Sequence, residues 1–172
     1  VAVHLLAYLF DPESQEFAVE RERLRDERVT RLRAMAVRMA AAGLPIDPEA
    51  ILAYAGPAVG RPHLARALVR AGVVDSVGDA FTDLLSTRSP YYVEKSDTPL
   101  ERAVEMVADA GGVSVIAHAR ARARGRLLDL EHIRELAEHG LGGLEVDHPD
   151  HGAADTALLR SLAAELDLVA TG

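Results

Sequence analysis

The chain opens on ten almost wholly apolar residues, VAVHLLAYLF (residues 1–10), and this run predicts a buried strand. Over residues 16–88 the apolar positions change to the spacing of helices. The longest helix is expected from Glu16 to Ala42, with an apolar stripe on one side and with Gly43 and Pro45 to end it. Shorter helices are expected after it at 47–54, 60–71 and 75–86. Helices that follow one another in this way predict a small bundle.

From Tyr91 onward the pattern alternates between strands and helices. Thr98 and Glu101 have the spacing of a capping box, which predicts the start of a helix. This alternation predicts an α/β fold, with a parallel sheet or barrel whose strands are joined by right-handed crossovers. Functional residues in such folds lie at the carboxyl ends of the strands. The expected helices are 98–110, 130–139 and 153–166, and the expected strands are 113–117, 144–146 and 168–170.

Both ends of the sequence fall in strand-like segments, VAVHLLAYLF at the start and DLVATG at the end. Chain termini normally lie outside packed elements. We therefore expect the 172 residues to be an internal part of a larger protein. A natural small domain that begins with a strand is the alternative.

Composition narrows the classes of function. The chain has no cysteine, which excludes disulfide frameworks, cysteine-bound metals and thiol nucleophiles, and which fits a cytoplasmic protein. No apolar run approaches 18 residues, so we expect no membrane-spanning segment. A net charge of −8 argues against a partner such as long double-stranded nucleic acid, because proteins that coat nucleic acid are usually basic.

Histidines and carboxylates gather at predicted strand ends. His118 directly follows the strand VSVIA, where an imidazole can bind a metal or can be an ordinary loop residue. His4 lies inside the first apolar strand, and its position alone favours a core histidine over a metal ligand. A third group follows the strand 144–146 and is compatible with either a metal site or a solvated turn. It consists of Asp147, His148, Asp150 and His151.

Basic residues suggest anion binding at three places. Arg120, Arg122, Arg124 and Arg126 alternate just after His118, where they either bind an anion or form a solvated basic loop. Arg61 and His63 stand at the start of a predicted helix, whose free N–H groups favour phosphate, although helix starts of this kind are common. Lys95, the single lysine, is by itself more typical of a solvated surface residue.

Five segments occur in an order that resembles one enzyme family: VHLLAYLFDP, GRPHLARALVRAGVV, YYVEK, GGVSVIAHA and GLEVDHPDH. The chain resembles the PHP (polymerase and histidinol phosphatase) superfamily of metal-dependent phosphoesterases. The branch it resembles contains the nucleoside 3′,5′-bisphosphate phosphatases and the short-RNA 5′–3′ exonucleases. The resemblance implies a distorted (β/α)7 barrel with an all-helical insertion over the active site. Residues 1–15 and 89–172 are then part of the barrel, and residues 16–88 are the insertion.

The resemblance also implies a cluster of two or three divalent metals, with manganese expected first and iron or zinc as alternatives. The family's ligand set begins with an HxH motif and ends with a DxH motif, and neither motif occurs in this chain. Their places in the family pattern lie before Val1 and after Gly172. The resemblance assigns His4 and His118 as the metal ligands that remain, so it reverses the expectation that His4 belongs to the core.

Further roles are implied for residues that match the family pattern. The substrate phosphate is expected to contact Arg61, His63 and Lys95, and also Arg122 or Arg126. His151 matches a histidine expected to support the metal ligands without binding metal itself. Two departures, Ala119 in place of proline and Arg120 in place of glycine, leave open which arginine after His118 points inward.

The implied reaction is hydrolysis of a phosphate ester by a metal-bound hydroxide, with no serine or cysteine nucleophile. The expected substrates are nucleoside 3′,5′-bisphosphates or the 5′ ends of short oligoribonucleotides. We expect the 172 residues alone to be inactive, because two histidines cannot hold a cluster of two or three metals. The alternative is a non-catalytic module of a degenerate PHP domain that binds a nucleotide or a protein.

Overall fold

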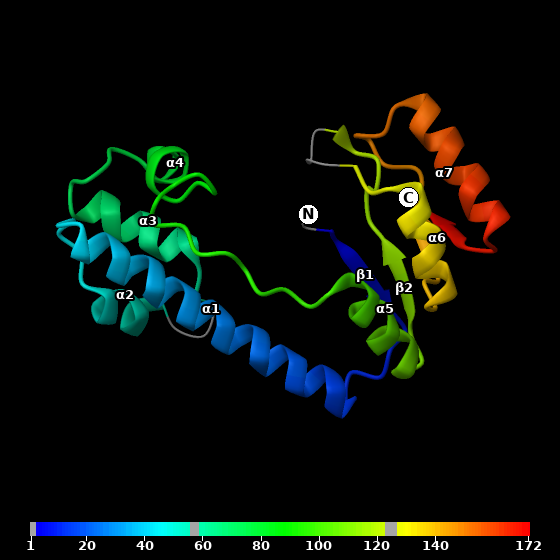
Figure 1. Ribbon diagram of the computed structural model, residues 1–172, viewed down its shortest axis with the longest axis horizontal. Helices are drawn as coiled ribbons and strands as arrows, with labels where there is room; N and C mark the ends of the chain where they lie inside the picture. Colours follow the sequence, from blue (N-terminus) through cyan, green and yellow to red (C-terminus); the bar gives the residue numbers. More distant parts are fainter. Residues whose placement is uncertain (1–2, 56–58, 123–126) are drawn as a thin grey trace. The chain divides into compact units, whose positions relative to one another are not determined.

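The computed structural model describes residues 3–55, 59–122 and 127–172. The chain divides into two compact units, each shown in Figure 1. The sheet unit comprises Val1–Ala18 and Thr98–Gly172, and the helical unit comprises Val19–Asp97. These limits differ by a few residues from the expected limits of 1–15, 16–88 and 89–172. The assignment of the helical unit as an insertion over an active site stays a prediction.

The sheet unit contains a four-stranded mixed sheet in the order β1-β2-β3-β4. The strands are β1 (Leu5–Tyr8), β2 (Val113–Ile116), β3 (Gly143–Glu145) and β4 (Val169–Thr171). β2, β3 and β4 are parallel neighbours, but β1 runs antiparallel to β2. The expected α/β class is confirmed, and the three strands from the alternating part of the chain, β2, β3 and β4, are parallel as predicted. The direction of β1 was not predicted. An apolar run predicts that a strand forms, but it carries no information about the strand's direction.

β1 also differs from its prediction in burial. The sequence predicts a buried strand, but three of the four residues are half-buried and Tyr8 is 47% exposed. The next residue, Leu9, is 89% exposed and has a positive φ of 58°. The reason is that β1 stands at the end of the described strand order and has one strand neighbour, β2. A strand in this position shares fewer of its side chains with the core than a central strand does.

Three helices alternate with strands β2, β3 and β4 at nearly the expected positions: α5 (Leu100–Asp109), α6 (Leu130–Glu138) and α7 (Ala153–Glu165). Their apolar faces pack on the sheet in one core that includes the fully buried Val104, Ile133, Leu144 and Leu159. The predicted capping box is wrong, because Pro99 is the N-cap of α5 and makes no side-chain cap hydrogen bond. Thr98 therefore lies one residue too early to be the N-cap.

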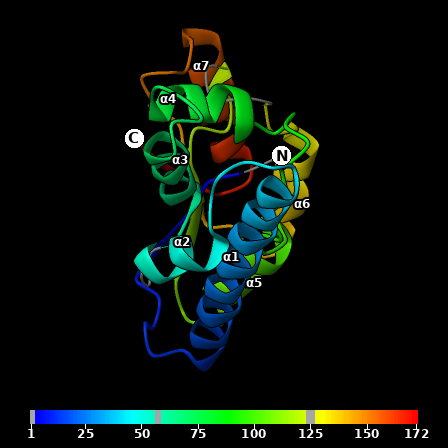
Figure 2. The same ribbon diagram turned by 90° about the vertical axis from the view of Figure 1, so that its left-hand side faces the viewer.

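The helical unit is formed around α1 (Gln15–Ala41), which continues into it from the sheet unit. As predicted, Gly43 follows the helix with a φ of +87°, a conformation that glycine adopts without strain. Asp47 caps α2 (Pro48–Ala55) by accepting from the backbone N–H groups of Glu49 and Ala50. α3 spans Arg61–Arg70. Figure 2 shows these helices from a second direction.

The fourth expected helix, 75–86, takes a different form. The structure has a three-residue turn, α4 (Val77–Asp79), which continues into a π-helical turn at Ala80–Leu84. Ser76 caps the start of this segment by accepting from the backbone N–H of Asp79. The apolar pattern therefore located the segment correctly but not its hydrogen-bonding geometry.

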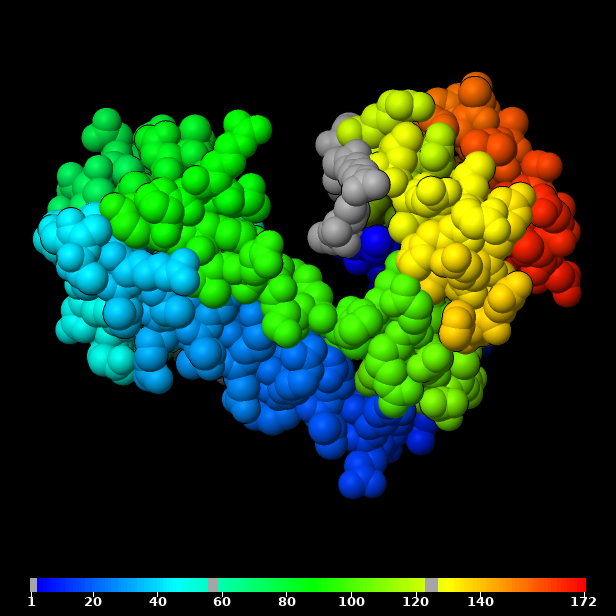
Figure 3. Space-filling view, viewed as in Figure 1, coloured from blue at the N-terminus to red at the C-terminus, as the bar shows by residue number. Residues whose placement is uncertain are grey.

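The core of the helical unit joins one face of α1 to α3 and to the segment that follows. Its fully buried side chains include Met35, Met39, Leu64, Leu68 and Leu85. The segment 91–97 lies along α1, as Figure 3 shows. Two arginines of α1 hold it there through side-chain donors, Arg31 to the carbonyl of Val93 at 2.7 Å and Arg38 to that of Tyr92 at 2.7 Å.

One exposed ion pair on α1 also orders this segment. Arg23 donates two hydrogen bonds to the carboxylate of Glu20, both at 2.7 Å, and this pairing raises the pKa of Arg23 above its ordinary value. The same guanidinium donates to the carbonyl of Ser96 at 3.3 Å. Glu27 accepts from the backbone N–H of Ser96 at 3.1 Å. The contacts between α1 and residues 92–96 are thus mainly polar at this end.

Candidate metal centre at the ends of β1 and β2

The structure brings together the two histidines that the family resemblance selects. The Nδ1 atom of His4 and the Nε2 atom of His118 are 3.0 Å apart. The two rings meet edge to face, with centroids 4.9 Å apart and an interplanar angle of 79°. His4 is exposed, so it is not a core histidine.

The antiparallel pairing of β1 explains why residues far apart in sequence meet here. Leu5 is opposite Ile116 in the register, so the start of β1 lies beside the carboxyl end of β2. The backbone N–H of Ala117 donates to the carbonyl of His4 at 2.9 Å and extends the pairing by one residue. His118, the next residue, therefore lies close to His4.

His118 adopts an unusual backbone conformation, with a φ of +40°. For a residue other than glycine, this left-handed conformation costs about 1–3 kcal/mol and persists only where neighbours fix it. The side chain of Glu145, at the end of β3, accepts a hydrogen bond of 2.7 Å from the backbone N–H of His118. The parallel pairing of Ile116 with Leu144 sets this carboxylate beside the loop. Glu145 thus holds the backbone of His118 in place.

His151 fixes the same loop from the other side. Its Nδ1 donates to the carbonyl of Val146 at 2.9 Å, and its Nε2 accepts from the backbone N–H of Arg120 at 3.4 Å. Both ring nitrogens are therefore engaged with the backbone, and His151 supports the loop in this structure. His148 lies next to it, with its ring centroid 5.5 Å from that of His118. Its Nδ1 accepts from the backbone N–H of Asp150 at 3.0 Å.

The pair His4–His118 fits two neighbouring ligands of one divalent metal. Two imidazole nitrogens bound to the same ion at roughly 2.1 Å and at a right angle are about 3 Å apart. The observed separation of 3.0 Å has this length, and in this structure the two ring nitrogens share a hydrogen bond. Within residues 3–55, 59–122 and 127–172, no group of three or more histidine, aspartate or glutamate side chains is arranged to hold a metal.

The arginines after His118 are less available than their sequence suggests. Arg120 donates from Nε to the carboxylate of Asp155 at 3.1 Å, and the two side chains are only 18% and 16% exposed. Arg122 is 73% exposed and lies 3.9 Å from the same carboxylate. Asp155 therefore offsets part of the positive charge predicted beside His118. Arg126 lies outside the described residues.

The other predicted phosphate contacts lie in the helical unit. Arg61 donates to the carbonyl of Leu85 at 3.0 Å. His63 is half-buried, and its Nδ1 donates to the carbonyl of Gly60 at 3.3 Å. Lys95 is half exposed and pairs with Asp97 at 3.0 Å. Arg61 and Lys95 line one cavity, and His63 is not among the residues that line it.

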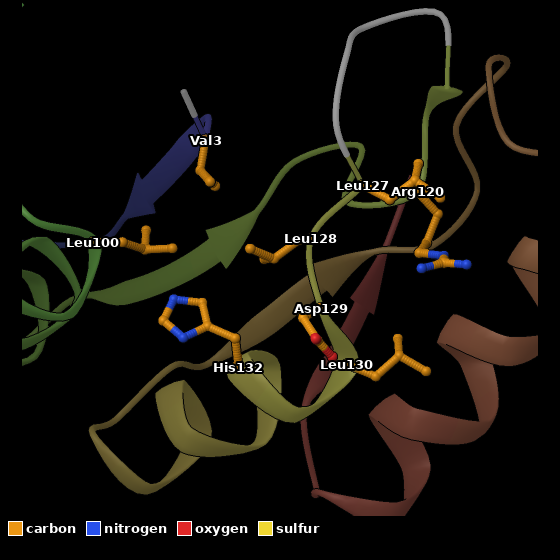
Figure 4. A pocket seen from close by; sticks show the side chains of 8 residues that line it. All are labelled: Val3, Leu100, Arg120, Leu127, Leu128, Asp129, Leu130 and His132. Carbon is orange, nitrogen blue, oxygen red and sulfur yellow. The ribbon is translucent and has the colours of Figure 1, made fainter. Parts of the chain in front are cut away.

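A cavity of about 650 Å³ opens elsewhere in the sheet unit (Figure 4). Its lining is mainly apolar, and neither His4 nor His118 contributes to it. Figure 4 shows the guanidinium of Arg120 at the end of the cavity away from Leu100. Because it lacks the histidine pair, we assign this cavity no part in metal chemistry. Its lining residues are Val3, Leu100, Arg120, Leu127, Leu128, Asp129, Leu130 and His132.

Comparison with known proteins shows which enzymes this chain is similar to. The chain is 30% identical to a 3′,5′-nucleoside bisphosphate phosphatase of Chromobacterium violaceum over 155 residues, which are 89% of this chain and 54% of that protein. A solved structure from Bifidobacterium adolescentis, assigned as a metal-dependent phosphoesterase, matches 100% of this chain and 62% of its own, with a TM-score of 0.81 and 36% identity. The chain is thus similar to a bisphosphate phosphatase and to a protein assigned as a metal-dependent phosphoesterase. The predicted resemblance is confirmed.

A second relative is named as an exoribonuclease. The chain is 28% identical to the 5′–3′ exoribonuclease Rnm of Escherichia coli over 174 aligned positions, 98% of this chain and 58% of the relative. The chain thus spans a little over half the length of these curated relatives. Both are hydrolases, so they give no support to the non-catalytic alternative.

The chain matches no protein-family model. Of the helices that the structure describes, none is long and apolar enough to cross a membrane.

Some residues of the site escape prediction from the sequence. Glu145 has no role predicted from the sequence, and its partner His118 is 27 positions away. Asp155 had no predicted role, although it pairs with Arg120 across 35 positions. In both cases the only available signal is a carboxylate near the edge of a predicted element. The contact between Glu145 and His118 depends on the pairing of β2 and β3.

Proposed function

We propose that this chain is part of a metal-dependent phosphoesterase that hydrolyses nucleoside 3′,5′-bisphosphates or the 5′ ends of short oligoribonucleotides. The observation that carries the proposal is the His4–His118 pair, whose ring nitrogens converge to 3.0 Å where β1 and β2 meet. It occurs in a chain that is 36% identical, along its whole length, to a protein assigned as a metal-dependent phosphoesterase. The printed activities of the relatives supply the two substrate classes.

His4 and His118 are the proposed metal ligands of this chain. A bound divalent cluster, manganese in the first instance, supplies activation of water and neutralisation of phosphate charge. The proposed metal-binding atoms are Nδ1 of His4 and Nε2 of His118, which share a hydrogen bond in this structure that metal binding would replace. Glu145 and His151 hold the backbone on either side of His118, which limits the positions open to its ring. The remaining ligands are proposed to come from HxH and DxH motifs that this sequence does not contain.

Arginine, lysine and histidine side chains are proposed to hold the substrate phosphates. Arg61, His63 and Lys95 carry this role in the helical unit, and Arg122 and Arg126 carry it beside His118. Guanidinium groups suit phosphate because their N–H groups match its oxygens in pairs. In this scheme the side chains position the phosphate and no protein side chain forms a covalent bond to phosphorus.

We also propose a fold and a cellular location for the whole protein. The four strands of the sheet unit are proposed to belong to a distorted (β/α)7 barrel, and the helical unit to be its insertion over the active site. The proposed location is the cytoplasm, which the lack of cysteine favours. No long double-stranded nucleic acid is expected as a partner of this acidic chain.

The test measures manganese-dependent phosphate release from adenosine 3′,5′-bisphosphate and nucleotide release from a short RNA. The proteins are the longer reading frame that contains this sequence, the same frame with His118→Ala, and the 172-residue chain. We expect activity in the unmodified longer protein alone. An active 172-residue chain would contradict the incomplete metal site. A folded, metal-loaded longer protein that hydrolyses neither substrate would overturn the proposed function.

A further inference from the structure

The surface of the helical unit carries an exposed aromatic ring that is paired with an arginine. Tyr54, in the last turn of α2, is 68% exposed. The guanidinium of Arg70, the last residue of α3, lies 5.0 Å from the centre of its ring. Attraction between a cation and the face of an aromatic ring holds the two planar groups together. Arg70 is itself exposed, so the pair is open to a ligand from solvent, and we call it the Tyr54–Arg70 platform.

A cavity of about 240 Å³ lies beside the platform, between α2 and α3, and Arg70 lines it. Ala50 also lines it and is one turn before Tyr54 on α2, so the ring is on the same side of the helix as the cavity. Apart from Arg70 and Asp47, the lining is aliphatic, and Asp47 is already engaged in capping α2. The cavity is thus small, mainly apolar and bordered by a cation.

The arginines of this surface have no acidic partners in the part of the chain that the structure describes. Arg66 is exposed and stands one turn before Arg70 on α3, and neither guanidinium makes an ion pair with a described residue. α3 contains three arginines and no acidic residue. The acidic excess of the chain lies elsewhere, since the helical unit has 12 basic and 11 acidic residues and the sheet unit has 7 and 16. An anionic ligand is therefore favoured at this end of α3.

We infer that the Tyr54–Arg70 platform binds one base of a single-stranded oligoribonucleotide, while Arg66 and Arg70 pair with its phosphates. Proteins stack unpaired bases on aromatic rings and guanidinium planes, and cations beside them bind the backbone. The cavity is smaller than the roughly 300–1,000 Å³ of pockets that enclose a whole ligand, so it suits part of a nucleotide. The choice of RNA rests on the proposed function, whereas the stacking surface and its charge do not.

This site is separate from the phosphate contacts proposed above. Those contacts include Arg61, the first residue of α3, whereas the platform uses the last. Nine residues of helix place the two positions about 14 Å apart along the axis, at 1.5 Å per residue. One phosphate group therefore cannot contact both, and the platform binds a different part of the substrate. The inference gives the protein a means to favour short RNA over a mononucleotide.

The test uses the fluorescence of the 172-residue chain, freed of metal with a chelator and then dialysed. The chain has no tryptophan, so Tyr54→Trp introduces a single indole into the platform. The probe is a pentamer of adenylate, and a base stacked on the indole should quench its fluorescence. Tyr8→Trp is the matched control, because Tyr8 is an exposed tyrosine of the sheet unit. We expect quenching in Tyr54→Trp alone. No quenching there, or equal quenching in both variants, would overturn the inference.

Calorimetry with the same pentamer separates stacking from charge. Tyr54→Ala should raise its dissociation constant by about fivefold or more, the effect of one stacked base. Arg66→Gln and Arg70→Gln should each reduce the slope of log affinity against log salt by about 0.7, the effect of one phosphate contact to a single strand. Arg88→Gln should leave the slope unchanged, since Arg88 is an exposed arginine of the same unit outside α2 and α3. Equal slopes in the three arginine variants would contradict a located site.

A second probe tests whether the base itself is bound. An abasic oligomer of equal length carries the same ribose phosphates without bases, and it should bind at least about fivefold more weakly than the adenylate pentamer. Equal affinity would identify a site for any polyanion and overturn the inference. These titrations involve neither metal nor turnover. RNA binding at the platform and phosphoesterase activity are therefore measured separately, and the failure of one is distinguishable from the failure of the other.

Discussion

The two units of this chain collect functional side chains in different ways. In the sheet unit, His4, His118 and Glu145 meet because strand pairing fixes where each strand ends. Their polar atoms contact one another at 3.0 Å or less. In the helical unit, arginines of α1 and α3 line a common cavity, and one donor of Arg31 has no partner among the residues that the structure describes. The sheet unit orients individual atoms, whereas the helical unit concentrates charge.

Core truncation should give the largest change and should separate the two units. Leu64 is fully buried in the core of the helical unit, and Leu144 is fully buried in that of the sheet unit. Leu64→Ala and Leu144→Ala should each lower the free energy of unfolding by about 2–5 kcal/mol, because each leaves a cavity. Amide hydrogen exchange should show the lost protection mainly in the unit that carries the substitution. Equal loss in both units would contradict separate cores.

Removal of a proposed metal ligand is the next largest effect. In the longer protein, His118→Ala should lower manganese-dependent phosphate release by more than about 100-fold, beyond the 10–100-fold typical of residues that only support a ligand. His139→Ala is a matched control, because His139 is an exposed histidine at the end of α6. The loss should appear as weaker metal binding in calorimetry with little change in thermal stability. Wild-type metal affinity in His118→Ala would reject the assignment.

Substitution of Glu145 tests whether the orientation of the loop at His118 affects metal binding. Glu145→Ala removes the acceptor for the His118 N–H, and metal affinity should fall by about 10–100-fold, as for other residues that orient a ligand. Glu145→Gln retains a carbonyl oxygen at the same place and should recover most of the affinity. The NMR shift of the His118 amide proton reports the same contact without any metal. Equal affinities in the two variants would show that the hydrogen bond is unimportant.

The smallest effect is expected at the ion pair beside the histidine centre. Asp155→Asn removes the charge opposite Arg120 and should lower the free energy of unfolding by about 1 kcal/mol or less, since ion pairs near a surface contribute little. If Arg120 and Arg122 then become available to anions, inorganic phosphate should bind the variant more tightly than the unmodified chain. A loss above about 3 kcal/mol would indicate a buried pair that the unit needs in order to fold.

Elements were predictable where local chemistry decides them. α1 ends at Ala41 and α2 begins after its Asp47 cap, as the glycine and aspartate in the sequence predict. The prediction of a capping box was wrong at Thr98, because the neighbouring Pro99 became the N-cap. The direction of β1 could not be predicted, because it depends on pairing with a strand more than 100 residues later.

The same distinction applies to the candidate sites. His118 was predicted as a site residue because it directly follows a strand. This prediction needs no knowledge of which distant residues contact it. His4 needed the family resemblance, since only the antiparallel pairing of β1 brings it to His118. Arg31 has no role predicted from the sequence, and its contact with Val93 spans 62 residues. Side chains that meet through such distant contacts leave no local pattern in the sequence.

The central claim is that His4 and His118 bind one divalent metal together, and NMR can test it on the 172-residue chain. Because manganese(II) is paramagnetic, small additions broaden the signals of the nearest ring protons among the seven histidines. The account predicts that His4 and His118 broaden first and together, while His63, His132 and His139 keep sharp signals. Broadening centred on another histidine, or His118 affected without His4, would contradict the shared site.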